Sequence, residues 1–548
     1  MKRNIEALAD RRFDLLVVGG GIHGAMIAWH AALAGFSVAL VERGDFGCST
    51  SANSQKIIHG GLRYLQNLDF PRTRQSILER RRLLRLAPHL VSPMPCMMPI
   101  YGGDLKGRAV MGTGLTLYDC LSWDRNIGVA RWARIPKGRL IEAPEVLALV
   151  PGLDSERLRG GAVWYDGICS NTERLIVGFA RTAEMHGAVV ANRIEVQGWM
   201  ATGGRVEGAG FKDLETGAVG EIRCKHVVDC RGPLSGHGLA GPQTEPVPGA
   251  AKAFAHGINF VVDLPAAEKI AFAVSGRPAG QQRLYFSVPW RNTAMIGTEW
   301  FLYRGHPEEL VLHEAQCQAF VDHFNIVFPP AELQLQDIRF IYHGLVPADE
   351  GGSSAQNVKL LRHFRILSER ETGLRGLVSL VGVKYTTAGH VASEVLRELL
   401  PGWREVDSVD QEYIGRSLDR EGILQHLQAR WGANASPSEL LDLFSDYGAE
   451  AVAIADLAET IGLNDPLALW KAQALFGVRE EMARSLSDLY FRRSNRGDLG
   501  RPSQTELETM AELIGNELGW DPTRKSQEIS AVLDCYPSFI GGTTTGES

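Results

Sequence analysis

A glycine-rich turn near the N-terminus, set between an apolar and an alanine-rich segment, constrains the fold more than any other feature of this sequence. The run from Phe13 to Val18 (FDLLVV) is typical of a buried parallel strand. The turn after it reads GGGIHG, and residues 25–34 predict a helix that ends at Gly35. Residues 37–41 predict a second strand. This order of strand, turn, helix and strand predicts an α/β fold with a Rossmann-like start.

Three glycines of the turn have the spacing G-x-G-x-x-G, and each has a separate role. Gly19 permits the tight turn, Gly21 lets the main chain approach a pyrophosphate, and Gly24 lets the helix pack closely on the strand. The N-terminus of the helix favours negative charge. Glu42, directly after the second strand, stands where an acid accepts hydrogen bonds from the adenosine ribose. The unit predicts a site for an ADP-containing dinucleotide, either FAD or NAD, since both cofactors use it.

The segment after Glu42 is rich in small and hydroxyl-bearing residues and ends in a dense motif. Residues 45–55 read DFGCSTSANSQ, and residues 56–65 read KIIHGGLRYL. Without gaps, this closely resembles FAD-dependent glycerol-3-phosphate dehydrogenases and oxidases, whose loop ends in K-[LI]-I-H-G-G-L-R-Y-L and crosses the flavin and the pyrophosphate. The resemblance implies that the cofactor is FAD and that the chain is a D-amino-acid-oxidase-like flavoprotein.

Shorter matches continue the resemblance along nearly the whole chain. They are residues 80–88 (RRRLLRLAP), 227–233 (VVDCRGP), 287–299 (SVPWRNTAMIGTE), 380–387 (LVGVKYTT) and 478–494 (VREEMARSLSDLYFRRS). The last match resembles the helical domain appended to these enzymes. From the glycine-rich unit and the resemblance together, we expect these cofactor-binding residues: Gly19, Gly21, Gly24, Glu42, Thr50, Ser51, Ser54, Lys56, Ile58, Gly232, Gly382, Lys384 and Thr386.

The pattern beyond the glycine-rich unit predicts two further domains. Residues 284–288 and 293–297 alternate as in an antiparallel sheet and flank a Pro-Trp-Arg-Asn turn. Beyond residue 402 the pattern changes to helices with clear starts, such as SPSE at residues 436–439. We therefore expect a Rossmann-like FAD-binding domain, an antiparallel β substrate domain and a C-terminal helical domain. The expected ranges are 10–100, 155–235 and 355–400 for the FAD-binding domain, 101–154 and 236–354 for the substrate or cap domain, and 401–540 for the helical domain, with a loose tail at 541–548.

Oxidation of an alcohol by a flavin requires a base for the hydroxyl proton and cationic support for the reduced ring, because hydride passes to flavin N5. The resemblance places His59 at the substrate face of the flavin, so His59 is the candidate base; the alternative is a histidine that only hydrogen-bonds beside the cofactor. His343 is a second candidate base. Lys384 matches a family lysine near the flavin, where its charge stabilises the anionic reduced ring. Arg63 and Arg362 align with the family's active-site region and suit a phosphate or carboxylate, although Arg362 aligns loosely and an exposed arginine is the alternative there.

Two departures from the family pattern concern the substrate. Where the family has Y-x-G-[LV]-R-P-L, residues 342–348 read YHGLVPA, so Val346 replaces a phosphate-binding arginine. The family's K-G-x-H is HGIN here, at residues 256–259, so His256 replaces a lysine. Loss of one charge-assisted contact weakens binding by about 1.5 to 3 kcal/mol. We therefore expect oxidation of glycerol 3-phosphate, or of a related glycerol-phosphate-like secondary alcohol, to the ketone, with a larger or differently charged relative left open.

Three functions are compatible with these observations. The first is a dehydrogenase that acts on a phosphorylated polyol and passes electrons to a quinone or another acceptor. The second is an oxidase of an amine or a hydroxy acid, and the third is a flavin-binding protein without turnover. A product assay separates the first two, because peroxide formed together with ammonia indicates an amine oxidase.

Composition and charge narrow the partners and the location. The net charge of −7 gives no reason to expect nucleic acid as a partner. The eight cysteines are scattered, as is typical of reduced thiols in a cytoplasmic protein, and no cluster has the spacing of a metal site. No run approaches the roughly 20 apolar residues that span a bilayer, and the charged N-terminus is unlike a signal peptide. We expect a cytoplasmic protein, and peripheral contact with the inner face of a membrane stays open.

Overall fold

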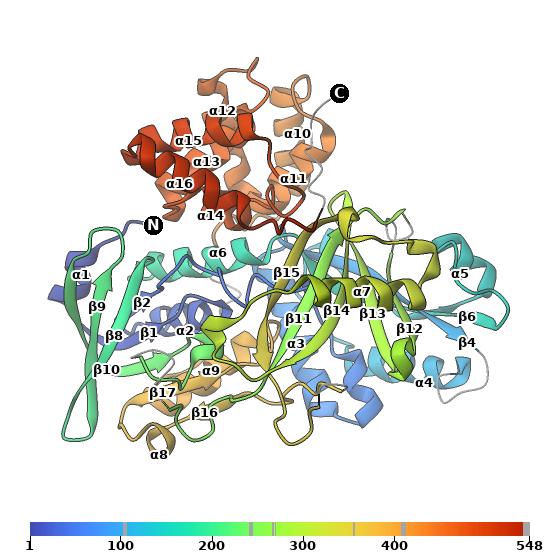
Figure 1. Ribbon diagram of the computed structural model, residues 1–548, viewed down its shortest axis with the longest axis horizontal. Coiled ribbons are helices and arrows are strands. Elements are labelled where there is room, and N and C mark those ends of the chain that lie inside the picture. The colour runs from blue at the N-terminus through green and yellow to red at the C-terminus, as the bar shows by residue number, and fades with distance from the viewer. Residues whose placement is uncertain are drawn as a thin grey trace.

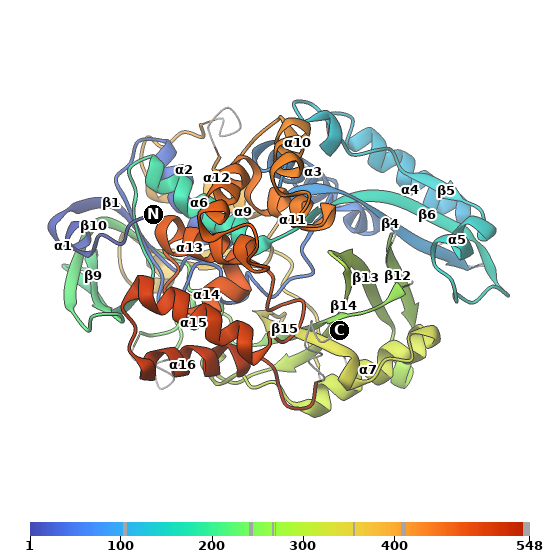
Figure 2. The same cartoon turned by 90° about the horizontal axis from the view of Figure 1, so that it is seen from above.

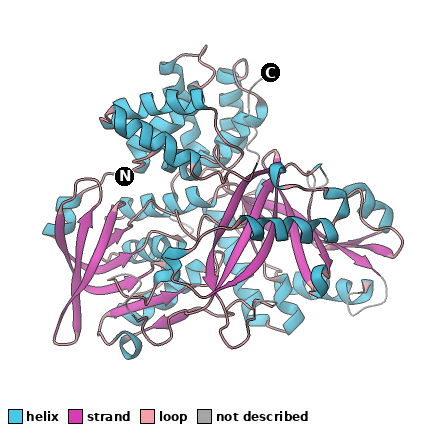
Figure 3. Cartoon of the chain, in the orientation of Figure 1, coloured by secondary structure: helices cyan, strands magenta, loops and turns pink. Residues whose placement is uncertain are grey.

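Two β-sheets lie side by side, and the helices of the C-terminal part of the chain lie above them (Figure 1). The computed structural model describes residues 1–101, 107–239, 245–265, 268, 270–354, 357–406 and 413–540. The tail at 541–548, which we expect to be loose, lies outside the described residues. Figure 3 separates the two groups of strands from the helical layer. The predicted fold class, an α/β protein with a second β domain and a C-terminal helical domain, is confirmed.

The first sheet contains the predicted strand, helix and strand of the glycine-rich unit. β1 (Arg12–Val18) pairs in parallel with β2 (Val38–Val41) and with β10 (Val219–Asp229), which itself pairs in parallel with β17 (Leu377–Val381). α2 (Ile22–Leu33) is buried on nearly all sides, which explains why its sequence is apolar throughout. The other strands are β7 (Val189–Ala191), β8 (Ile194–Thr202), β9 (Arg205–Asp213) and β16 (Arg365–Leu367). The order is β16-β17-β10-β1-β2-β7; in addition β9 pairs antiparallel with β10, and β8 pairs antiparallel with β9.

The second sheet is largely antiparallel. Its strands are β3 (Ile57–Ile58), β4 (Val91–Tyr101), β5 (Arg139–Ile141), β6 (Leu158–Cys169), β11 (Phe254–Val262), β12 (Ala271–Gly276), β13 (Arg283–Trp290), β14 (Thr293–Tyr303) and β15 (Ile338–Pro347). The order is β15-β11-β14-β13-β12-β4-β6-β3, with β5 beside β6. The hairpin predicted over residues 284–297 is confirmed as β13 and β14, and Arg291 has a φ of 52° in its turn. α7 (Glu314–Val327) covers one face, with Phe320 stacked on Phe260.

The strand pairing changes the expected domain boundaries. β4 and β6 pair with each other along their length and belong to the second sheet, although the ranges 10–100 and 155–235 assign most of their residues to the FAD-binding domain. Both strands are long and apolar, so their sequence does not reveal which sheet they join. The division into domains stays a proposal, with these two strands moved to the substrate domain.

The C-terminal helices pack on one another and on the second sheet (Figure 2). They are α10 (Arg420–Trp431), α11 (Pro437–Tyr447), α12 (Ala451–Ile461), α13 (Ala468–Glu481), α14 (Leu486–Asp488), α15 (Gln504–Leu518) and α16 (Pro522–Leu533). The start predicted at SPSE is confirmed: Ser436 Oγ accepts from the Glu439 amide at 3.2 Å, and Glu439 Oε2 accepts from the Ser436 amide at 2.8 Å. Phe491 stacks on Phe340 of β15, so the helices share a core with the sheet.

The remaining α-helices precede β1, follow β17 or link strands of the two sheets, and among them only α6 leads from one sheet to the other. They are α1 (Ile5–Asp10), α3 (Phe70–Leu86), α4 (Arg108–Leu121), α5 (Ala143–Leu149), α6 (Thr172–Met185), α8 (Glu369–Thr372) and α9 (Ala388–Leu399). α6 and α9 pack against α2 of the first sheet. In the part of the chain that the structure describes, no helix has the length and hydropathy needed to span a membrane.

Candidate active site

The glycine-rich turn leaves no room for a side chain at two of its positions. Gly19 has a φ of +108°, and a Cβ there would lie 2.4 Å from the carbonyl oxygen of Cys230. A Cβ on Gly24 would lie 1.9 Å from the carbonyl oxygen of Gly19. Any other residue would force these main-chain segments apart. The turn therefore presents bare main chain at the N-terminus of α2, which is the arrangement that a bound pyrophosphate requires.

Glu42 lies directly beyond β2 and holds the turn from the other side. Its Oε2 accepts from the Gly20 amide at 2.6 Å, and its Oε1 accepts from the Gly44 amide at 2.7 Å. Burial raises the pKa of Glu42, and the two amide hydrogen bonds act in the opposite direction. This position matches the acid that we expect at the adenosine ribose, and the contact itself stays a prediction.

The hydroxyl-rich loop crosses the N-terminus of α2. Ser51 Oγ accepts from the Ile22 amide at 3.1 Å, and a Cβ on Gly21 would lie 3.0 Å from the same oxygen. Thr50 Oγ1 donates to the carbonyl oxygen of Leu345 at 2.9 Å, which ties the loop to β15 of the second sheet. The loop therefore runs from the glycine turn to the second sheet, and its passage across a bound flavin and pyrophosphate stays a prediction.

Lys56 points its side chain away from this site. Its Nζ is fully buried, donates to the Glu173 carboxylate at 3.0 Å, and lies 5.2 Å and 4.8 Å from the ring centroids of Trp290 and Tyr342. The ammonium group is therefore occupied by a buried ion pair, and the role of Lys56 in binding the cofactor stays a prediction. Lys56 can therefore contact the cofactor only through its main chain, and Ser54 can do so through its hydroxyl. Ser54 Oγ accepts a hydrogen bond from the Lys56 amide at 3.2 Å.

His59 lies beside the segment that follows β17. Ile58 pairs with β6 and fixes the start of the motif, and the His59 amide then donates to Thr386 Oγ1 at 3.3 Å. The imidazole is exposed. Dehydration by the surrounding protein, together with the positive charges of Lys384 and two arginines, lowers the pKa of His59, and Asp166 acts in the opposite direction. An imidazole that is neutral near pH 7 can accept a proton.

A buried cluster supports the main chain next to His59. The Gly60 amide donates to Asp166, whose other oxygen accepts from Trp164 Nε1 at 3.0 Å. Arg80 Nη1 donates to the same Asp166 at 2.9 Å, and a Cβ on Gly60 would lie 1.7 Å from Tyr118 Oη. The sequence analysis missed Asp166 and Tyr118, because nothing in the sequence near them indicates a partner in the 59–61 segment. Arg80 was noted only as part of a family match.

Lys384 faces Tyr64, a further residue that the sequence analysis did not single out although it lies in the family motif. Lys384 Nζ donates to Tyr64 Oη and lies 4.0 Å from the centroid of that ring. The Arg72 guanidinium lies 4.4 Å from the same centroid. Burial, followed by the charge of Arg72, lowers the pKa of Lys384 to about 7. Lys384 therefore changes its charge in the physiological range.

The two expected anion-binding arginines are exposed near Tyr64. Arg63 forms no ion pair or hydrogen bond with any residue that the structure describes. Arg362 is also exposed, and its carbonyl oxygen accepts from the Arg72 guanidinium. Arg72 thus connects the Arg362 segment to the ring of Tyr64. The exposed guanidinium groups of Arg63 and Arg362 are available to an anion.

His343 lies on the opposite face of the second sheet from the nucleotide-binding loop. Its Nδ1 is 3.2 Å from His256 Nε2, and His256 Nδ1 is 3.4 Å from Gln316 Nε2 on α7. The next residue, Gly344, faces Asn53 of the loop, because a Cβ there would lie 3.2 Å from the Asn53 Cβ. Successive side chains of a strand point to opposite faces. The structure therefore does not bring His343 together with His59, and a role for His343 as a base stays a prediction.

The remaining predicted residues lie where strands of the first sheet end. Gly232 follows β10 with a φ of +63°, and a Cβ on Gly382, after β17, would lie 2.5 Å from the His23 ring. His23 is in the first turn of α2, and its buried Nε2 has no hydrogen-bond partner among the described residues. An unpartnered polar atom at the edge of a bare glycine turn fits a bound dinucleotide.

Known proteins resemble this chain over most of its length. A model of the family FAD dependent oxidoreductase matches residues 14–393, and a model of the C-terminal domain of alpha-glycerophosphate oxidase matches residues 408–525. A glycerol-3-phosphate dehydrogenase of Synechocystis sp. is 30% identical over 90% of each chain. Glycerol-3-phosphate dehydrogenase 2 of Mycobacterium tuberculosis is 29% identical over 95% of this chain and 88% of that protein.

The fold itself has also been seen in a crystal structure. The glycerol-3-phosphate dehydrogenase from Bacillus halodurans, solved in complex with FAD, superposes with a TM-score of 0.72 and 20% identity over 97% of this chain and 95% of that chain. The predicted family and the predicted cofactor are confirmed by these matches and by the glycine-rich turn. The chain belongs to the FAD-dependent glycerol-3-phosphate dehydrogenase family of FAD-dependent oxidoreductases, and FAD is its cofactor.

Proposed function

We propose that this protein oxidises glycerol 3-phosphate, or a related glycerol-phosphate-like secondary alcohol, to the corresponding ketone. The observation that carries the proposal is the grouping of His59, Lys384 and Tyr64 at the edge of the first sheet where β17 ends. Relatives named as glycerol-3-phosphate dehydrogenases match this chain almost end to end and support it.

In the proposed reaction His59 and the cations have separate tasks. An unprotonated imidazole nitrogen of His59 takes the proton from the substrate hydroxyl, which its lowered pKa permits near pH 7. FAD, when bound, would accept the hydride from the carbon that carries this hydroxyl. Arg63 and Arg362 bind the substrate phosphate through their exposed guanidinium groups. Lys384 adds the positive charge that favours electron transfer to the flavin.

Lys384 provides a test through its charge. We expect Lys384→Met to lower kcat by about 10²-fold, since one electrostatic contact in the transition state is removed. The pKa of Lys384 is about 7, so the wild-type rate should fall as the pH rises through that value. Lys384→Arg keeps its charge at alkaline pH and should remove this fall. Measurement of kcat against pH in the three proteins checks the prediction, and an unchanged alkaline limb in Lys384→Arg would contradict it.

The surroundings of Val346 favour a second candidate substrate, a glycerol phosphate with a further substituent. Val346 packs with Ala255, Ala348 and Trp300 on the sheet face that also carries Gly344, so this face is apolar where the family has an arginine. None of these described neighbours of Val346 offers a positive charge to a phosphate. An apolar substituent would gain contact area, at about 25 cal/mol per Å² that is removed from water.

Anaerobic bleaching of the flavin tests the substrate. We expect glycerol 3-phosphate at millimolar concentration to bleach the flavin absorbance, and glycerol not to do so. Faster bleaching by a substituted glycerol phosphate would favour the second candidate. No bleaching by either phosphate would remove both. Bleaching by an amine or a hydroxy acid alone would support the oxidase alternative, and no bleaching by any compound would support a flavoprotein without turnover.

The electron acceptor and the location complete the proposal. We infer a quinone as the acceptor and a cytoplasmic protein that contacts the inner face of the membrane. The surface formed by α4 and the turn after it supports this contact, because Trp123 is 75% exposed and Val110 and Ile127 are 54% and 56% exposed. Sedimentation with lipid vesicles tests the membrane contact. The rate of substrate oxidation with quinone-containing vesicles, compared with quinone-free vesicles and with a soluble dye acceptor, tests the electron acceptor.

A further inference from the structure

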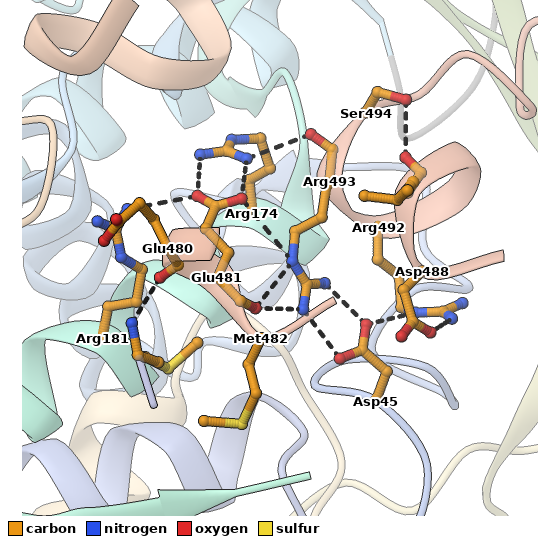
Figure 4. Close-up of polar contacts among 12 residues, drawn as sticks. Asp45, Arg174, Arg181, Glu480, Glu481, Met482, Asp488, Arg492, Arg493 and Ser494 are labelled. Atoms are coloured by element: carbon orange, nitrogen blue, oxygen red, sulfur yellow. Dashed lines mark hydrogen bonds and ion pairs between the residues drawn. The ribbon is translucent and has the colours of Figure 1, made fainter. Parts of the chain in front are cut away.

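The C-terminal helical domain forms hydrogen bonds and ion pairs with the loop that crosses the FAD-binding turn. We name residues 45–56 the nucleotide loop. Asp45, its first residue, is fully buried, and Arg493 of the one-turn π-helix η11 (Leu489–Arg493) donates to both of its oxygens, from Nη1 at 2.7 Å and from Nη2 at 2.9 Å (Figure 4). Arg492 Nε donates to Asp45 at 2.8 Å. We propose that this domain is a positioning element for FAD, which acts through Asp45 to hold the nucleotide loop against the glycine turn.

The arginine is fixed so firmly that it can define the position of Asp45. Arg493 is fully buried, and its Nε and Nη2 also donate to the carbonyl oxygen of Glu481, at 3.2 Å and 2.7 Å. The Glu481 carboxylate accepts in turn from Arg174 of α6, at 2.8 Å and 3.0 Å. A planar guanidinium whose Nε, Nη1 and Nη2 atoms all donate to buried oxygens is held in one orientation. π-Helical turns are frequently found at functional sites.

Asp45 is connected directly to the cofactor turn. Two residues after it, the Gly47 amide donates to the carbonyl oxygen of Gly20 at 3.0 Å. Further along the loop, Ser51 Oγ accepts from the Ile22 amide in the first turn of α2. A displacement of Asp45 therefore moves the main chain at the predicted pyrophosphate site, although neither arginine belongs to the glycine motif.

The far end of the nucleotide loop is held by an ion pair within the FAD-binding part. Lys56 forms its buried ion pair with Glu173 of α6, and no residue of the C-terminal domain is one of the two partners. The loop is thus fixed at one end within the FAD-binding part and at the other by the helical domain. If order in the loop is needed for FAD binding, docking of the helical domain and binding of FAD must stabilise each other by the same factor. This inference concerns the cofactor and is independent of the substrate.

Two methionine variants test the coupling. Arg493→Met removes the bonds to Asp45. Arg181→Met is the matched control, because Arg181 pairs with Glu450 and Glu481 across the same interface and does not contact the nucleotide loop. We expect the dissociation constant for FAD, measured by flavin fluorescence on titration of the apoprotein, to rise roughly 5- to 150-fold in Arg493→Met and less than about twofold in Arg181→Met. The unfolding temperature of each apoprotein separates this effect from a general loss of stability.

Isosteric variants keep the test decisive where a methionine variant does not fold. Asp45→Asn and Glu481→Gln each remove one negative charge from the same buried network, but only Asp45 belongs to the nucleotide loop. We expect FAD to dissociate faster from Asp45→Asn than from Glu481→Gln at equal thermal stability. Equal FAD release from the two, or unchanged FAD affinity in Arg493→Met, would overturn the proposal. Hydrogen exchange in η11 should also slow on FAD binding in the wild type and not in Asp45→Asn.

Discussion

His59→Gln should lower kcat by about 10²- to 10⁴-fold while the protein keeps its FAD, because a positioned general base contributes that factor. The side chain of His59 is exposed and forms no hydrogen bond with any residue that the structure describes, while its amide donates to Thr386. The glutamine variant should therefore fold and bind FAD normally. Steady-state kinetics together with the flavin content of the purified protein measure the effect.

We expect the pH dependence of the rate to identify His59 as the base. The pKa of His59 is lowered from its ordinary 6.5, so the imidazole is neutral above that value and becomes protonated as the pH falls through its lowered pKa. The wild-type kcat/KM should decline on the acid side below pH 6.5, and this decline should be missing in His59→Gln. His343→Gln is the matched control, and it should retain both the rate and the acid limb, because His343 bonds to His256 on the opposite face of the sheet. A retained acid limb in His59→Gln would assign the base elsewhere.

Gly24→Ala should weaken FAD binding by about 10- to 100-fold, the equivalent of roughly 1 to 3 kcal/mol of overpacking. The added methyl group would lie 1.9 Å from the carbonyl oxygen of Gly19, and the contact is with main chain, which cannot rotate away. The start of α2 must therefore move away from β1 and the pyrophosphate position. Equilibrium dialysis of the apoprotein against FAD measures the change.

A second alanine variant provides the control for Gly24→Ala. Gly114 lies within α4, and a Cβ there would meet nothing within 4 Å. Gly114→Ala should leave FAD affinity unchanged and raise the stability by about 0.5 to 1 kcal/mol, because alanine favours the helix over glycine. Normal FAD affinity in Gly24→Ala would show that the turn does not carry the cofactor.

Local sequence determined the elements that depend on neighbouring residues. The glycine turn followed from sterics, since Gly19 and Gly24 occupy positions that exclude a Cβ. The β13–β14 hairpin followed from the alternation over residues 284–297, and the start of α11 followed from its capping box. Each of these features is settled within a dozen residues, so a linear reading recovers it. The family resemblance added FAD and the positions of His59 and Lys384.

Only the tertiary structure decided which side chains meet. Lys56 has the place of a cofactor residue in its motif, yet it pairs with Glu173, which is far away in sequence. His343 depends on strand parity: one residue of register decides whether it faces the loop or α7. Asp166 reaches the Gly60 amide from a strand that joins the second sheet.

The ion pair between Arg493 and Asp45 could not be predicted from the sequence either. The two residues are 448 positions apart, and each is an ordinary charged residue in its own segment. The residue types and their spacing in a sequence predict where the backbone can turn and which segments form helices or strands. The partner of a buried charge is specified by the packing of whole domains, because only packing removes the water that would otherwise solvate that charge.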